Sequence, residues 1–322
     1  MRGYLAWRVA QALVTVAVVA TVTFALIHLA PGDPWSSLEN PRMSAAVSEH
    51  MRKVYGLDRP LQEQYWRYLA NLARGELGWS ISKQEPVATL LARALPNTLV
   101  LMGAALALSF AFGIAMGVVQ ASRAGSLTDR LLGRISLAFH ATPDFWLALA
   151  MLLVYALWLR WFPVGGRLDP LMHDSYGFWR RVADRLYHLV LPAGTLTLLL
   201  TASVARYQRA ALLDVAHEDY VRTARAKGLR ERGVLRHAWR NALLPVITLF
   251  GLTLPALVGG AVFIEQIFAW PGMGRLAVGA LAQRDYWLLT ACVVVVSAMV
   301  SVGSLVADLL HAAADPRLRR FR

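Results

Sequence analysis

Six long apolar segments limit the folds open to this chain more than any other feature of its sequence. Each is close to the length of about 20 residues that an α-helix needs to cross the hydrocarbon layer of a membrane. A helix also satisfies its own backbone hydrogen bonds, as the membrane interior requires. We therefore predict an all-α membrane protein with six transmembrane helices near residues 9–30, 98–120, 135–159, 189–207, 242–264 and 288–311.

The composition also indicates a membrane protein. Of the 322 residues, 57% are hydrophobic and only 16% are charged, which is too apolar for an average soluble protein. The net charge of +13 comes from basic residues that gather beside the apolar segments, as the positive-inside rule expects. This placement explains the charge without nucleic acid, so no nucleic-acid partner is predicted. The single cysteine, Cys292, lies inside an apolar segment and is interpreted as a packing residue.

The distribution of Lys and Arg predicts the orientation of the chain. If the N-terminus is cytoplasmic, the short inside loops carry more basic residues than the outside loops, so both termini are predicted to be cytoplasmic.

The segment before the second helix contains amphipathic stretches at residues 44–55 and 61–72, and either caps the bundle or docks a ligand carrier. The predicted parts are a first transmembrane helix (1–30), an extracytoplasmic domain (31–96), a five-helix core (97–311) and a cytoplasmic tail (312–322).

The most distinctive loop is a basic stretch at residues 218–245, EDYVRTARAKGLRERGVLRHAWRNALLP, between two apolar segments. Its acidic residues come first and its basic residues later, an order that suits the dipole of a helix. Glu218 and Arg222 stand four positions apart, the spacing of an ion pair on one helix face. Gly228 follows and is predicted to end this helix with a positive φ. A second basic helix is predicted at about residues 231–240.

This stretch resembles the EAA loop of ABC importer permeases, which in that family is a coupling helix that docks on a cytoplasmic ATPase. The matching residues are Ala224-Arg225-Ala226-Lys227-Gly228, followed by Asn241 and Leu244-Pro245 at the expected distance. The form DYVRTARAKGL is typical of the dipeptide, oligopeptide and nickel branch, the oligopeptide-permease B-type. Taken alone, the stretch also fits an ordinary basic loop beside the membrane.

Other motifs extend the resemblance over essentially the whole chain. They are HLAPGDP at 28–34, YGLDRPLQEQYWRYL at 55–69, TPDFW at 142–146, EQIF at 265–268 and PGMG at 271–274. One position departs from the family's pattern, because Trp287 stands where the family usually has Pro. The last helix is therefore expected to start differently from that of the family.

The resemblance implies a type I ABC importer permease fold in a bacterial cytoplasmic membrane, with the EAA loop at about residues 209–241. This chain would form half of the translocation pathway for a solute delivered by an extracytoplasmic binding protein. The implied partners are a second homologous permease subunit and two cytoplasmic ATPase subunits. The second permease is usually a distinct chain, which makes a heterodimer, and a second copy of this chain is left open. The implied substrate is a peptide, with nickel complexes, glutathione and a sugar oligomer left open.

The same resemblance implies roles for individual residues. Asn241 and Pro245 would pass movement from the coupling helix to the fifth transmembrane helix, and residues 123–134 would make a second, lesser contact with the ATPase. The residues implied to contact the ATPase directly are Glu218, Asp219, Tyr220, Arg222, Ala224, Ala226, Lys227 and Gly228.

The sequence contains no motif that would supply energy from within this chain. None of its three lysines follows a glycine as in a P-loop, so ATP and Mg²⁺ are expected on partner subunits and no cofactor on this one. The alternative is a gradient-driven secondary transporter, which usually needs a charged relay inside the membrane. The interiors of the predicted helices lack Asp and Glu, which disfavours this alternative. No catalytic or metal-ligand constellation is found, so neither an enzyme nor a metal site is predicted.

Three further expectations concern residues in or near the predicted helices. Asp308 is expected to be solvated at the cytoplasmic edge. Glu265 is expected to form an ion pair with Arg275 in a loop. Gly113 and Gly117 form a small-xxx-small pair and are expected to let two helices pack closely.

Overall fold

The computed structural model describes residues 2–29, 59–216, 218–228, 233, 239, 242–253 and 261–314. Within these ranges the protein is helical except for connecting loops and a short antiparallel pair in which Trp79 faces Pro86. The elements, in chain order, are α1 (Arg2–Leu29), α3 (Leu61–Arg74), β1 (Trp79–Ser80), β2 (Glu85–Pro86), α4 (Val87–Ser122), α5 (Leu127–Ala141), α6 (Asp144–Met151), the π-helix η2 (Leu152–Trp158), the 3-10 helix η3 (His173–Ser175), α7 (Phe178–Ala216), α8 (Asp219–Ala226), α10 (Leu244–Thr253), α12 (Val262–Ile267), α13 (Met273–Ala282) and α14 (Tyr286–Ala314).

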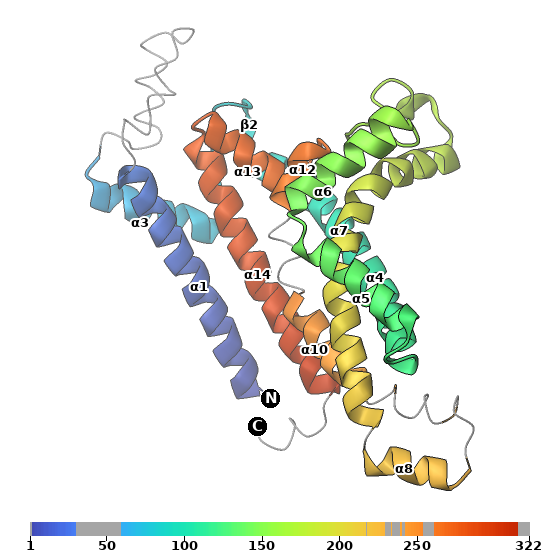
Figure 1. Cartoon of the computed structure of the whole chain (residues 1–322). Coiled ribbons are helices and arrows are strands. Elements are labelled where there is room, and N and C mark those ends of the chain that lie inside the picture. Colours follow the sequence, from blue (N-terminus) through green and yellow to red (C-terminus); the bar gives the residue numbers. More distant parts are fainter. Residues whose placement is uncertain are drawn as a thin grey trace.

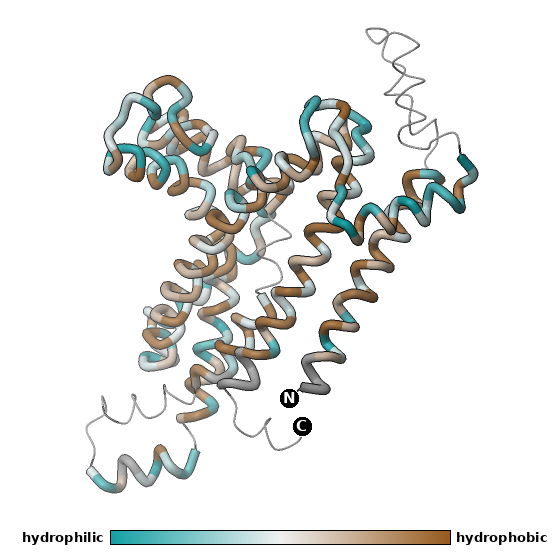
Figure 2. The backbone as a smooth tube through the Cα atoms, turned by 180° about the vertical axis from the view of Figure 1, so that it is seen from behind, coloured by the Kyte–Doolittle hydropathy of each residue, from teal (hydrophilic) through white to brown (hydrophobic). Residues whose placement is uncertain are grey.

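Four of the described helices are long and apolar enough to cross a membrane, namely α1, α4, α7 and α14 (Figure 1). Their midsections are mainly hydrophobic, whereas hydrophilic residues gather at their ends and in α8 (Figure 2). The predicted second, fourth and sixth segments lie inside α4, α7 and α14, and the first largely inside α1. α4 and α7 are longer than predicted, because α4 begins at Val87 and α7 continues through Pro192.

The third segment predicted at 135–159 is not one continuous helix. The chain there forms two helical pieces, α5 and α6 with η2, which meet at an angle of 104° and count as one span only if the bent pair is taken together. The break lies at Thr142 and Pro143, where Thr142 is extended with φ −79° and ψ 129°. A proline disfavours helical geometry in the residue before it, which explains the position of the break.

The fifth predicted helix at 242–264 is described only in part. α10 covers its first half and α12 begins at Val262, while residues 254–260 lie outside the described residues. The total of six transmembrane helices therefore stays a prediction. The amphipathic stretch predicted at 61–72 is confirmed as the helix α3, whereas the one at 44–55 lies outside the described residues.

α4 and α7 make the most extensive contact between helices, and two glycines of α4 permit it. A Cβ atom on Gly113 would lie 2.5 Å from the Cβ of Val204, and one on Gly117 would lie 2.7 Å from the carbonyl oxygen of Ala205. Neither position has room for a side chain, which confirms the predicted close packing. Gly103, earlier on α4, has nothing within 4 Å of the same position in the part of the chain that the structure describes.

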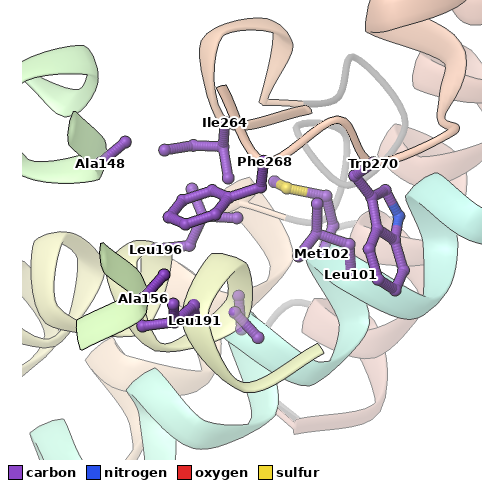
Figure 3. Close-up of a cluster of buried hydrophobic side chains, with 11 residues drawn as sticks. Leu101, Met102, Ala148, Ala156, Leu191, Leu196, Ile264, Phe268 and Trp270 are labelled. Carbon is purple, nitrogen blue, oxygen red and sulfur yellow. The ribbon is translucent and has the colours of Figure 1, made fainter. Parts of the chain in front are cut away.

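A cluster of buried hydrophobic side chains holds the upper part of the bundle together (Figure 3). It joins α4, α6, η2 and α7 to α12 and the turn that follows α12. Phe268 and Trp270 supply the largest side chains of that turn and are almost completely buried. The labelled members are Leu101, Met102, Ala148, Ala156, Leu191, Leu196, Ile264, Phe268 and Trp270.

α1 lies at the edge of the bundle against α14. An ion pair joins the two helices, in which Nη2 of Arg8 donates to Oδ1 of Asp308 at 2.8 Å. The expectation that Asp308 is solvated is therefore wrong. The two side chains are only 29% and 22% exposed, and pairing offsets the cost of removing a charge from water.

Candidate functional site

α8 lies beyond the ends of the spanning helices (Figure 1). It follows α7 almost directly, and the amide groups of Val221 and Arg222 donate to the carbonyl oxygen of Glu218 as the helix begins. Gly228 follows its last turn with φ +75°, which confirms the predicted positive φ. Among the described residues, nothing lies within 4 Å of the place where a Cβ of Gly228 would be. The site therefore needs glycine for its backbone conformation rather than for space.

One residue of α8, Val221, anchors the helix to the bundle. Its side chain is 1% exposed and packs with Ala211 and Leu212 of α7 and with Ala242. Partly buried residues at the end of α4 complete the same cluster. Val221 was not predicted from the sequence, although it is the only branched aliphatic residue in the polar stretch DYVRTARA.

The remaining described side chains of α8 are exposed, including Tyr220, Arg222 and Ala226. Arg222 pairs with Asp219 at 3.7 Å instead of with Glu218, so the predicted ion pair is wrong. The Arg222 and Asp219 side chains are 75% and 96% exposed, and a pair in that setting contributes little stability. These polar groups are open to a partner.

The structure places the other predicted site residues as follows. Four of them are exposed in α8 or directly beside it, namely Glu218, Asp219, Lys227 and Gly228. Pro245 is exposed in the first turn of α10. The side chain of Ala224, all of Asn241 and most of the predicted helix at 231–240 lie outside the described residues.

An ion pair between the buried Asp129 and the half-buried Arg209 joins α5 to α7 at the end of the bundle that carries α8. Arg209 donates from Nε and Nη2 to the two carboxylate oxygens of Asp129, at 2.8 and 2.9 Å. Asp129 also accepts from the amide of Gly125 at 3.0 Å, and Ser126 caps α5. This two-pronged pairing fixes the turn before α5 against α7.

At the opposite end, a buried carboxylate organises the turn after α12. Glu265 is fully buried and accepts from Thr98 Oγ1 at 2.7 Å and from the amide of Arg275 at 3.0 Å. The guanidinium of Arg275 donates instead to the carbonyl of Ala269. The predicted ion pair between Glu265 and Arg275 is therefore wrong, because the carboxylate contacts the backbone of Arg275 and not its charge. Trp270 adds a hydrogen bond from Nε1 to the carbonyl of Asn97.

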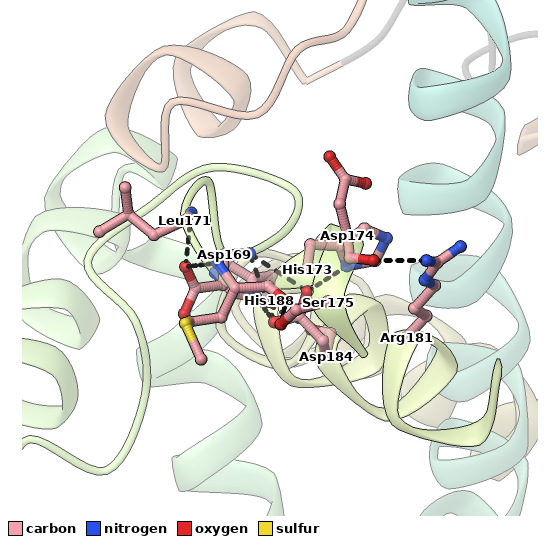
Figure 4. Close-up of polar contacts among 9 residues, drawn as sticks. Asp169, Leu171, His173, Asp174, Ser175, Arg181, Asp184 and His188 are labelled. Atoms are coloured by element: carbon pink, nitrogen blue, oxygen red, sulfur yellow. Dashed lines mark hydrogen bonds and ion pairs between the residues drawn. The ribbon is translucent and has the colours of Figure 1, made fainter. Parts of the chain in front are cut away.

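A polar cluster that was not predicted ties the loop before α7 to the first turns of that helix (Figure 4). Nδ1 of His173 lies 2.6 Å and Nδ1 of His188 lies 3.2 Å from the carboxylate of Asp184, which also accepts from the amide of Asp169. The Asp169 carboxylate accepts from the amides of the next turn, which lowers its pKa. Within the described residues, no group of three or more His, Cys, Asp or Glu is placed to hold a metal ion.

An apolar hollow of about 770 Å³ lies between α4, η2 and α7. Phe112, Tyr155 and Leu189 line it, and the described lining contains no charged side chain. Gly194 opens into this hollow, with nothing within 4 Å of the place where its Cβ would be.

Comparison with known proteins decides the family. The profile described as "Binding-protein-dependent transport system inner membrane component" matches residues 109–320. A second family profile, described as "Binding-prot-dependent transport system membrane comp, N-term", matches residues 1–102. The chain belongs to the binding-protein-dependent transport system inner membrane components, the ABC importer permeases. This confirms the resemblance that the EAA loop and the other motifs indicated.

Relatives of this permease extend over its whole length. It is 40% identical over 320 residues to the oligopeptide transport system permease protein AppB of Bacillus subtilis, with 99% of both chains covered. It is 39% identical to the di/tripeptide transport system permease protein DppB of Pseudomonas aeruginosa, with 100% of both covered. It is 35% identical to the glutathione transport system permease protein GsiC of Escherichia coli strain K12, with 99% of both covered.

A solved structure supports the fold. The inward-facing MetNI methionine ABC transporter contains a chain that matches this permease with a TM-score of 0.57 and 19% identity, covering 72% of this chain and 99% of that one. At this identity the likeness concerns the fold alone. The helical architecture described above is thus that of a type I ABC importer permease.

Proposed function

We propose that this permease forms half of the translocation pathway of an ATP-driven importer that carries peptides. The permease function rests on the family match over nearly the whole chain. The substrate is proposed from three relatives named for oligopeptides, di- and tripeptides, and glutathione, which is itself a tripeptide. The hollow between α4, η2 and α7 suits this role, because a lining without charges does not select one chemical group.

The observation that carries the coupling proposal is the exposed polar face of α8 beyond the bundle. Tyr220, Arg222 and Lys227 offer aromatic and charged groups to an ATPase, while Val221 holds the helix to α7. Force on α8 would reach α7 and the end of α4 through Val221, and the fifth helix through Ala242 beside Asn241. This route adds to the one through Gly228, Asn241 and Pro245.

The proposed assembly follows from the family. It comprises this chain, a second homologous permease, two cytoplasmic ATPase subunits that bind ATP and Mg²⁺, and an extracytoplasmic solute-binding protein. The proposed orientation places α8 and both termini in the cytoplasm, in agreement with the basic residues beside the predicted helices. The end that carries the Asp184 cluster then faces outward, toward the binding protein.

Uptake of a labelled tripeptide by cells with and without this chain tests the proposal. Collapse of the proton and sodium gradients by ionophores, at a maintained ATP level, should leave most of the uptake in place. Depletion of ATP at a maintained gradient should abolish it. The opposite pattern would support a gradient-driven carrier and contradict the proposed energy source.

A further inference from the structure

α3 lies across the end of the bundle opposite to α8, beside α1 and the beginning of α14 (Figure 1). Tyr65 of α3 and Thr21 of α1 join their hydroxyl groups at 2.8 Å. The ring of Phe24 lies 5.4 Å from that of Tyr65 and 5.6 Å from that of Tyr68, measured between centroids. These contacts fix α3 against the last turns of α1.

A cavity of about 480 Å³ lies where α1, α3 and α14 meet. Phe24 and Ile27 of α1 form an apolar part of its wall. Arg67, Asn71 and Arg74, which all belong to α3, supply hydrogen-bond donors to the same cavity. The cavity therefore combines an apolar wall with a cationic one.

The charges around the cavity suit a single anionic group. Arg67 and Arg74 carry two positive charges and Glu76 carries one negative charge. The Asp, Glu, Lys and Arg side chains that line the cavity therefore have a net charge of +1. Arg67 already contacts Glu63 at 3.2 Å, but both side chains are about half exposed and water can still reach the guanidinium. A guanidinium binds phosphate through paired hydrogen bonds.

A buried hydroxyl adds a further donor. Tyr68 lines the cavity, and its Oη atom is buried and has no hydrogen-bond partner among the described residues. Burial and the neighbouring Tyr65 raise the pKa of Tyr68 to about 12, so the hydroxyl stays protonated at neutral pH. A buried donor without a partner costs free energy, which a bound acceptor would recover.

The position of the cavity matches the headgroup level of a membrane. α1 ends at Leu29, just after the residues that line the cavity, and α14 begins with Tyr286 and Trp287, which line it as well. Trp66 of α3 is 68% exposed. Tyr and Trp are enriched where a membrane meets water, so three parts of the chain place the cavity at this boundary.

We propose that this cavity binds a membrane phospholipid. The headgroup phosphate lies between Arg67 and Arg74 and accepts from Asn71 and Tyr68, while an acyl chain runs along Phe24 and Ile27. In the orientation proposed above, the lipid belongs to the outer leaflet. It fills the space between the edge helix α1 and α14 and so joins them where α3 crosses. The inference does not depend on the transported substrate.

Native mass spectrometry of the purified full chain, mixed with phosphatidylglycerol in mild detergent, tests the proposal. The double variant Arg67→Gln/Arg74→Gln should bind the lipid at least roughly tenfold more weakly, the loss that one charge-assisted hydrogen bond would cause. Arg59→Gln is the matched control, because Arg59 neighbours the same helix and pairs with Glu63 but does not line the cavity. It should bind the lipid as the wild type does.

Equal binding by all three proteins would overturn the proposal. A second measurement does not depend on the variants: a photoactivatable phosphatidylglycerol in reconstituted vesicles should label peptides that contain residues 61–74 of the wild-type chain. Labelling confined to other helices would overturn it as well. Inorganic phosphate at millimolar concentration should not displace the lipid, and displacement would identify a site for a free anion instead.

Discussion

Gly228 shows at the scale of one residue how a backbone conformation can be essential without any contact. Its φ of +75° lies in the left-handed region, which costs a residue with a side chain roughly 1–2 kcal/mol. Since no atom of the described residues lies within 4 Å of the place of a Cβ, the prediction concerns the backbone conformation. We expect Gly228→Val to lose most peptide uptake at normal membrane abundance, because a β-branched residue redirects the chain after α8.

Gly228→Asn is the matched control for this prediction. Asn tolerates a positive φ better than other residues with side chains, so this variant should retain most uptake. Equal uptake by the Val and Asn variants, measured as initial rates in intact cells, would show that the positive φ is not needed for coupling.

Sequence reasoning found the polar residues near helix ends but not their partners. Gly228 was predicted correctly because its conformation depends on its immediate neighbours. Asp308 pairs with Arg8, 300 positions away, and Glu265 with Thr98, 167 positions away. A carboxylate in a sequence carries no sign of such distant donors, so its solvation or its ion pair was assigned from local spacing and was wrong.

Among the elements, α8 is held in position by Val221, the buried one among its described side chains. We expect Val221→Asp to detach α8 from α7 and to reduce peptide uptake strongly, because an unpaired charge would replace an apolar contact and cost roughly several kcal/mol. Val221→Ile keeps an apolar side chain in the same contact and should keep most uptake. Uptake would be measured at matched membrane abundance, and an equal loss in both variants would contradict the anchoring role.

The contact between α4 and α7 gives a second prediction for elements. Gly117→Ala places a methyl group 2.7 Å from a carbonyl oxygen, and overpacking typically costs about 1–3 kcal/mol. Thermal unfolding in detergent should therefore occur at a lower temperature. Gly103→Ala, on the same helix with no atom of the described residues within 4 Å of the new methyl group, should not lower the unfolding temperature, because Ala favours a helix over Gly. No difference between the two variants would mean that the helices adjust freely.

The helices themselves were largely predictable, because apolar length marks a membrane segment directly. The bend between α5 and α6 was not predicted, although Thr142-Pro143 stands in the middle of the third segment. Apolar length indicates a segment that crosses the membrane but not its local geometry, which the proline decides. The role of Val221 as the anchor of α8 was not predicted either. It depends on contacts with the ends of α7 and α4, which the sequence around Val221 does not indicate.

At the scale of the whole molecule, the two ends of the bundle differ in what they expose. α8 occupies one end, and the loop that contains Leu171 occupies the other (Figure 1). In a Cys292→Ala background, Leu171→Cys should react with an impermeant maleimide on intact spheroplasts, because Leu171 is 88% exposed. Lys227→Cys should react only after lysis. The reverse pattern would invert the proposed orientation.

The family and its permease function were recoverable from the sequence because the motifs extend along the whole chain. The EAA loop from Ala224 to Gly228 and the EQIF and PGMG turns all lie within the matched region. The cavity beside α3 was not foreseeable, since it needs the ends of α1 and α14 to meet.

The most direct test of the central claim is site-specific photocrosslinking from α8 in native membranes. A photoreactive amino acid at Tyr220, which is exposed on α8, should crosslink to a P-loop ATPase identified by mass spectrometry. The same group at Trp179, exposed at the other end of the bundle, should capture no ATPase. A crosslink to an ATPase from Trp179 and none from Tyr220 would contradict the assignment of α8 as the coupling surface.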